Sequence, residues 1–150
     1  MSRFWQLFWK YVFISVLLSV VVVVSLLYYG DYSMLKTIAI DMVYLIGVLY
    51  FVDNALILWL LSKMKKVEKV TGGIFHDTYH EIMKTNAELR ILALVALVIV
   101  ALLSWYDLHR NVIMVLSVFM LSILIDYILI TRDIVKALFI LNRYQKIFQK

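Results

Sequence analysis

Four long apolar stretches, separated by short charged segments, make up most of this 150-residue chain. They cover residues 11–29, 40–61, 91–105 and 112–130. A helix needs about 20 apolar residues to cross the hydrocarbon core of a bilayer. Each stretch is therefore predicted to be a transmembrane helix. The pattern predicts an all-α, polytopic membrane protein with four spans in a single domain.

Basic residues divide unequally between the two sides that these spans define. Thirteen Lys and Arg residues lie on the side of both termini and of residues 63–89, and only Lys36 and Arg110 lie on the other side. Segments that flank spans on the cytoplasmic side are enriched in Lys and Arg. The distribution predicts that both termini are cytoplasmic and that the protein is integral to the cytoplasmic (inner) membrane.

Two segments outside the spans have structure of their own. Residues 63–89 form a predicted cytoplasmic loop, in which Gly72 and Gly73 mark a break and residues 74–89 indicate a short helix. The tail, residues 133–150, has apolar residues at helical spacing and basic residues on another face. We expect an amphipathic helix that lies on the acidic inner leaflet or continues the fourth span into the cytoplasm.

Composition excludes several kinds of chemistry. The chain is 65% hydrophobic and has no cysteine, which rules out disulfides, thiolate chemistry and iron–sulfur clusters. It also lacks proline, so proline kinks in the spans are not expected. No nucleophile–base pair or phosphate-binding loop is recognisable. We expect a non-enzymatic protein without a cofactor.

Ionisable residues within spans are costly and are the first candidates for function. Asp53, followed by Asn54, lies past the middle of the second span, and Asp126 lies about one turn from the inner end of the fourth. Each aspartate is either a proton or cation site or a polar contact that joins helices. The two lie eight and four residues from the inner ends of their spans, so their depths differ by about 6 Å. A shared inner vestibule requires that they face each other, which the sequence does not show.

A weaker signal lies in the loop. His76 and His80 have the i, i+4 spacing that places two imidazoles on one helical face, and a nearby carboxylate would complete a divalent-metal site. No third histidine lies on the same side, because His109 is predicted to lie across the membrane. An exposed polar helix explains the same residues. The lysines between Lys63 and Lys69 favour contact with acidic lipid headgroups over nucleic acid, because they adjoin a span.

Two segments resemble the PsiE family of phosphate-starvation-inducible membrane proteins. Leu49-Tyr50-Phe51, three residues and then Ala55-Leu56-Ile57 are similar to the family's second span, whose intervening triplet carries an acid; here that acid is Asp53, shifted by one position. The stretch from Leu89-Arg90 to Asp107 is similar to the third span. The chain departs from the family in having Leu102 and Leu103 where a second Arg is usual, and in lacking a Pro after the loop Asp.

The resemblance implies a stress-linked membrane role and draws attention to Arg90 and Asp107. The leading interpretation is a PsiE-like protein that acts by self-association, as a homo-oligomer, or as an accessory subunit of a larger membrane complex. The alternatives are a small oligomeric ion or proton channel that uses Asp53, and a holin-like protein that permeabilises the membrane.

Overall fold

A computed structural model describes residues 3–72, 76–105 and 107–148; for residues 3–10, 70–71, 76 and 144–148 only the backbone is described. The described residues form four helices and no strand, as the sequence predicts. Their bounds are α1 (Arg3–Tyr29), α2 (Tyr32–Thr71), α3 (His76–Trp105) and α4 (Arg110–Phe148). All four contain a segment that is long and apolar enough to cross a membrane. The chain thus has the fold of a multi-pass membrane protein.

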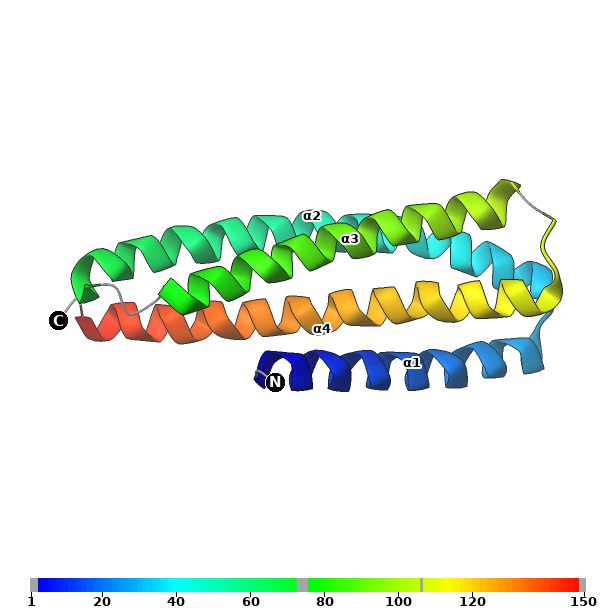
Figure 1. Cartoon of the computed structure of the whole chain (residues 1–150), viewed down its shortest axis with the longest axis horizontal. Coiled ribbons are helices and arrows are strands. Elements are labelled where there is room, and N and C mark those ends of the chain that lie inside the picture. The colour runs from blue at the N-terminus through cyan, green and yellow to red at the C-terminus, as the bar shows by residue number, and fades with distance from the viewer. Residues whose placement is uncertain (1–2, 73–75, 106, 149–150) are drawn as a thin grey trace.

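Consecutive helices run in opposite directions and form an elongated bundle (Figure 1). The start of α1, the end of α2, the start of α3 and the end of α4 lie toward one end, which we call the basic end because the sequence places most Lys and Arg there. At the opposite, outer end, Asp31 caps α2 by accepting a hydrogen bond from the Met34 amide at 2.8 Å. At the basic end, Gly72 ends α2 with a φ of 72°, a left-handed conformation that glycine adopts without strain.

The long helices extend well past a bilayer. α2 has 40 residues and α4 has 39, which at 1.5 Å per residue is about 60 Å, against a hydrocarbon core of roughly 30 Å. Both helices, together with the start of α3, project beyond α1 at the basic end (Figure 1). The predicted tail therefore continues α4. The predicted loop, residues 63–89, is mostly helical, because α2 runs on to Thr71 and α3 already begins at His76.

Helix α4 is central to the bundle. It contacts each of the other three helices, whereas α1 and α3 have no contact with each other among the described residues. Five consecutive residues in its middle, 120–124, are all buried. A helix with one side toward lipid would leave some of five consecutive residues exposed. α1 is the opposite case, since Phe13 and Leu17 are 69% and 57% exposed. Such apolar exposure requires lipid around the bundle.

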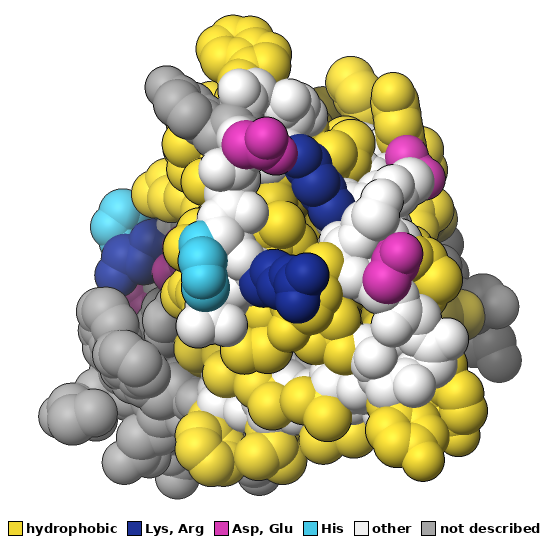
Figure 2. Space-filling model, turned by 90° about the vertical axis from the view of Figure 1, so that its right-hand side faces the viewer, with side chains coloured by type: hydrophobic (Ala, Val, Ile, Leu, Met, Phe, Trp, Pro, Cys, Tyr) yellow, Lys and Arg dark blue, Asp and Glu magenta, His cyan; other side chains and the backbone are white. Residues whose placement is uncertain are grey.

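The outer end is closed by short connections and one aromatic contact. The Arg110 guanidinium lies over the Tyr32 ring, 5.6 Å from its centroid, and so joins the start of α4 to the start of α2. Figure 2 looks onto this end, where charged side chains lie in the middle of the face and hydrophobic side chains form most of the rim. Arg110 thus contacts an aromatic ring at this end of the bundle. The hydrophobic side chains of the rim are suited to contact with lipid.

The predicted orientation is testable because the chain contains no cysteine. We expect Asn111→Cys to react with a membrane-impermeant maleimide in intact cells, and Lys66→Cys to react only after the membrane is opened. Both residues are exposed. If only Lys66→Cys were labelled in intact cells, the orientation would be the opposite of the predicted one.

Candidate functional site

Three hydrogen bonds join α4 to the other three helices. All of them involve a six-residue segment of α4, residues 126–131. Asp126 bonds to α1, Tyr127 to α3 and Thr131 to α2. Their partners are the Ser15 hydroxyl, the Leu89 carbonyl and the Asp53 carboxyl group. We call Asp126, Tyr127, Thr131 and their partners Ser15, Leu89 and Asp53 the polar layer. One short segment of α4 thereby holds all three neighbouring helices.

Asp53 is fully buried, and its hydrogen bonding indicates how a carboxyl group is accommodated there. The Thr131 hydroxyl lies 2.6 Å from Asp53 Oδ1 and 2.8 Å from the Tyr127 carbonyl oxygen. A hydroxyl has one proton, and a carbonyl oxygen only accepts. Both contacts are satisfied when Asp53 is the neutral acid: its O–H donates to Thr131, and Thr131 donates to the carbonyl. A neutral acid also avoids burying a charge.

Asp126 has the same type of partner on α1. The Ser15 hydroxyl contacts Asp126 Oδ1 and also the carbonyl oxygen of Tyr11, at 2.5 Å in the second case. The same proton count applies, so a neutral Asp126 donating to Ser15 satisfies both contacts. Two carboxyl groups in the bundle thus each pair with a helical hydroxyl that bonds back to the carbonyl four residues earlier. Such polar contacts join helices in membranes.

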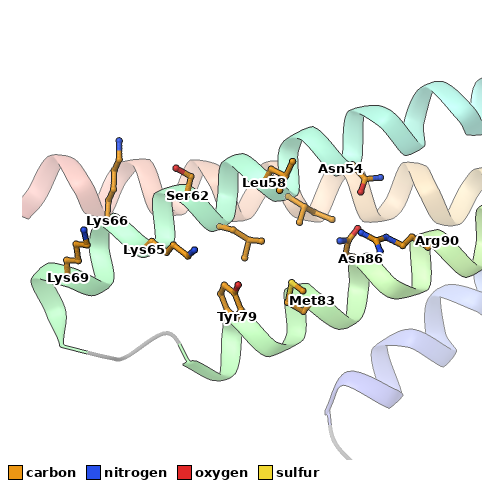
Figure 3. Close-up of a pocket in the computed structure, with 12 residues that line it drawn as sticks. Asn54, Leu58, Ser62, Lys65, Lys66, Lys69, Tyr79, Met83, Asn86 and Arg90 are labelled. Atoms are coloured by element: carbon orange, nitrogen blue, oxygen red, sulfur yellow. The ribbon is translucent and has the colours of Figure 1, made fainter.

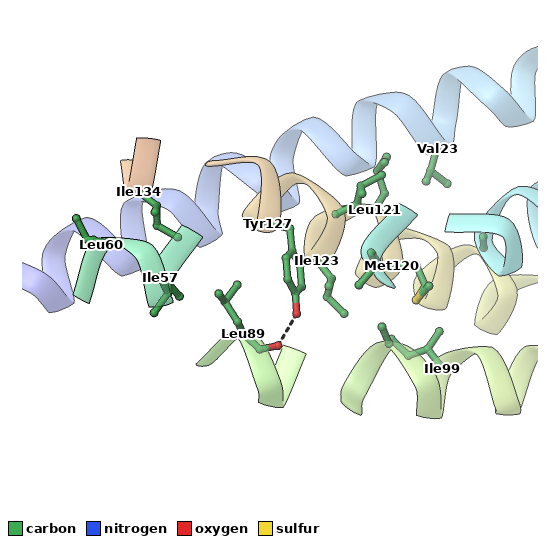
Figure 4. Close-up of a cluster of buried hydrophobic side chains, with 14 of the residues drawn as sticks. Val23, Ile57, Leu60, Leu89, Ile99, Met120, Leu121, Ile123, Tyr127 and Ile134 are labelled. Carbon is green, nitrogen blue, oxygen red and sulfur yellow. Dashed lines mark hydrogen bonds between the residues drawn. The ribbon is translucent and has the colours of Figure 1, made fainter. Parts of the chain in front are cut away.

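Tyr127 makes the third contact. Its ring is fully buried, and its hydroxyl donates to the carbonyl oxygen of Leu89 on α3 (Figure 4). A carbonyl oxygen has two lone pairs, so it can accept this bond in addition to a helical one. α3 contacts α2 more extensively than it contacts α4, and this bond adds a directional contact between α3 and α4.

The two aspartates do not share a vestibule. Asp53 bonds to Thr131, and Thr131 and Asp126 are five residues apart on α4, which places them about 140° apart around the helix axis. Asp126 instead points to α1. The Asn54 side-chain amide does not join helices either, because it donates to the Tyr50 carbonyl oxygen of its own helix at 2.7 Å. The predicted intramembrane polar residues therefore serve separate helix pairs.

The layer lies near the inner edge of the predicted spans. Ser15 is only four residues into the first span, Leu89 lies two residues before the third, and Thr131 directly follows the fourth. Asp53 is at the same level because it bonds to Thr131. It is thus closer to the interface than its place within residues 40–61 suggests.

The other predicted positions do not assemble into a site. The His76 side chain lies outside the described residues, and His80 is exposed. Within the described part of the chain, no three His, Asp or Glu residues are grouped to hold a metal ion. Arg90 lies in the middle of α3, whereas Asp107 follows the end of that helix at Trp105, 17 residues further along the chain.

Three side chains of the polar layer, in addition to the Leu89 backbone carbonyl, are absent from the sequence-based candidates: Ser15, Tyr127 and Thr131. Ser15 had a recognisable signal, because Ser15 and Ser19 are spaced by four in an otherwise apolar run and both are fully buried. Small polar residues at this spacing mark a helix-packing face. Tyr127 and Thr131 had none, because aromatic and hydroxyl residues are common near a membrane interface.

Two grooves flank α3. One, of about 720 Å³, lies between α1 and α3 over α4; Asp126 and Glu88 are among its lining residues, which are mainly apolar. The other, of about 710 Å³, lies between α2 and α3, and its charged lining residues are all basic (Figure 3). The two grooves therefore have opposite charge.

Comparison of the chain with known protein families, curated proteins and solved structures finds no match. The similarity to the PsiE family accordingly stays a prediction from the sequence segments around Asp53 and Arg90.

We expect Asp53→Asn to leave stability within about 0.5 kcal/mol of the parent protein, because the amide N–H donates to Thr131 as a neutral acid does. Thr131→Val leaves the buried carboxyl group without a partner and should cost about 1–3 kcal/mol. Equilibrium unfolding in mixed micelles measures both. Equal destabilisation by the two changes would show that the ionised carboxylate is required.

We expect Tyr127→Phe to lower stability by about 0.6–1.7 kcal/mol, the range for hydrogen bonds between membrane helices. Tyr44→Phe is the matched control, because Tyr44 is 72% exposed. The same unfolding assay applies, and equal effects of the two changes would argue against the bond to Leu89.

Proposed function

We propose that the chain is a non-enzymatic, PsiE-like protein of the cytoplasmic (inner) membrane that acts by self-association. The observation that carries the proposal is the groove between α1 and α3. These two helices leave one side of α4 uncovered, and the groove of about 720 Å³ is lined mainly by apolar side chains. An accessory role in a larger membrane complex uses the same surface with a different partner.

The groove suits another protein helix better than lipid alone. Lipid tails are as apolar as the side chains that line it, so apolar packing by itself gives no preference. Asp126 and Glu88 add polar atoms to this surface, and polar side chains favour helix–helix contact over lipid contact. A second copy of the chain, with the serines and threonines of its own helices, supplies matching donors.

The use of the buried carboxyl groups supports a structural role. Asp53 and Asp126 each bond to a hydroxyl of a neighbouring helix, so the costly intramembrane groups hold the bundle together. The stress-linked aspect of the proposal rests on the resemblance around Asp53 and Arg90. No catalytic role is proposed for either residue.

Cross-linking across the groove tests the proposal. We expect Val95→Cys, which lines the groove, to form disulfide-linked dimers in native membranes, and the protein in nanodiscs to have the mass of a discrete oligomer. Leu97→Cys is the control, because Leu97 is exposed on the same helix but outside the groove. A monomeric mass with no cross-link would exclude self-association, and unrelated polypeptides that co-purify would favour the accessory role.

One observation favours the alternative, an ion or proton channel. Asp53 Oδ2 is buried and has no hydrogen-bond partner among the described residues, which leaves this oxygen able to accept a proton. If the protein conducts protons through Asp53, Asp53→Asn will abolish the acidification of proteoliposomes while the oligomer mass stays unchanged. Equal proton flux in the two proteins would exclude this pathway.

A further inference from the structure

The groove between α2 and α3 combines a basic lining with an apolar one. Lys65, Lys66 and Lys69 come from α2 and Arg90 from α3, and no carboxylate is among the twelve lining residues. Within the described part of the chain, these four cations form no ion pair. Four uncompensated positive charges along one groove require an anionic occupant or a screening counterion.

The apolar residues of the groove lie between its charged ends. Leu58 and Met83 are 69% and 44% exposed, and both lie between Lys65 and Arg90 in Figure 3. In the same view the Lys65 side chain points along α2 toward Arg90, and the Arg90 side chain points back toward the basic end. The two cations therefore converge on a stretch of groove with apolar walls.

The depth of the groove identifies the source of the anion. Arg90 directly follows Leu89, whose carbonyl belongs to the polar layer near the inner edge of the spans. Asn54 of α2 lines the groove near Arg90. Lys65 lies eleven residues further along α2, a distance of about 16 Å. The headgroup region of the inner leaflet, about 5–8 Å thick, would fall within this interval, and long basic side chains can extend toward it from both sides.

We propose that this groove binds the phosphate headgroup of an anionic phospholipid of the inner leaflet. Lys65 and Arg90 contact the phosphate from the two sides, with Arg90 offering the planar guanidinium that matches two phosphate oxygens. The glycerol part of the lipid lies against Leu58 and Met83, which lie between these two cations, and the acyl chains continue past Arg90 into the hydrocarbon. A free phosphate ion carries the same kind of negative charge but makes no favourable contact with the apolar residues of the groove. A phospholipid matches both the charged and the apolar residues. Basic pockets between membrane helices on the cytoplasmic side suit such headgroups.

The proposal is independent of self-association, because the α1–α3 groove and the α2–α3 groove are lined by different faces of α3. A failure of one proposal therefore leaves the other standing.

Native mass spectrometry of delipidated protein tests the site, with phosphatidylglycerol and phosphatidylcholine as probes. We expect selective binding of phosphatidylglycerol, and roughly 30-fold weaker binding after combined Lys65→Gln and Arg90→Gln, from the contribution of each basic residue to anionic-lipid binding. Arg132→Gln with Lys136→Gln is the charge-matched control, because both residues are exposed on α4 outside the groove. This control should stay within about threefold of the parent protein.

Three results would overturn the proposal: equal binding of the two lipids, an equal loss in the control protein, or displacement of phosphatidylglycerol by millimolar inorganic phosphate. The last would assign the site to free phosphate. Thermal unfolding of both double variants verifies that each is folded, and Lys65→Arg with Arg90→Lys, which keeps both charges, should retain selectivity for phosphatidylglycerol.

Discussion

The bundle depends on hydrogen bonds that α4 makes to three other helices within one and a half turns. Inside a bilayer, apolar burial does not drive helices together, because lipid tails are as apolar as leucine. Polar contacts and close packing supply the specificity that the hydrophobic effect supplies in water. Asp126, Tyr127 and Thr131 provide such contacts to α1, α3 and α2, and the low dielectric strengthens them.

This arrangement also explains what the bundle leaves open. A single central helix has a limited circumference, and α2 takes the largest share of α4. α1 and α3 are each held mainly by contacts to their neighbours and do not meet. The groove between them follows from how the helices are placed around α4, and it is the surface on which the proposed self-association rests.

The polar layer also sets the orientation of the basic groove. Leu89 bonds to Tyr127 through its carbonyl oxygen, and the next residue, Arg90, is rotated by about 100° around α3. That rotation turns Arg90 from α4 toward α2 and the lipid, where it meets the lysines of α2. One hydrogen bond thus links the core of the bundle to the surface on which the proposed lipid site rests.

Local properties of the chain were sufficient to predict four apolar spans, their orientation, the break at Gly72 and the cost of Asp53 and Asp126. Hydropathy, charge and glycine content act over one element at a time. The partners of the two aspartates, the continuation of α2 through the predicted loop and the opposite charges of the two grooves emerged only from the structure, whereas the continuation of α4 was one of two alternatives that the sequence offered. Thr131 and Asp53 are 78 residues apart, and periodicity within one helix carries no information about the rotation and register of another.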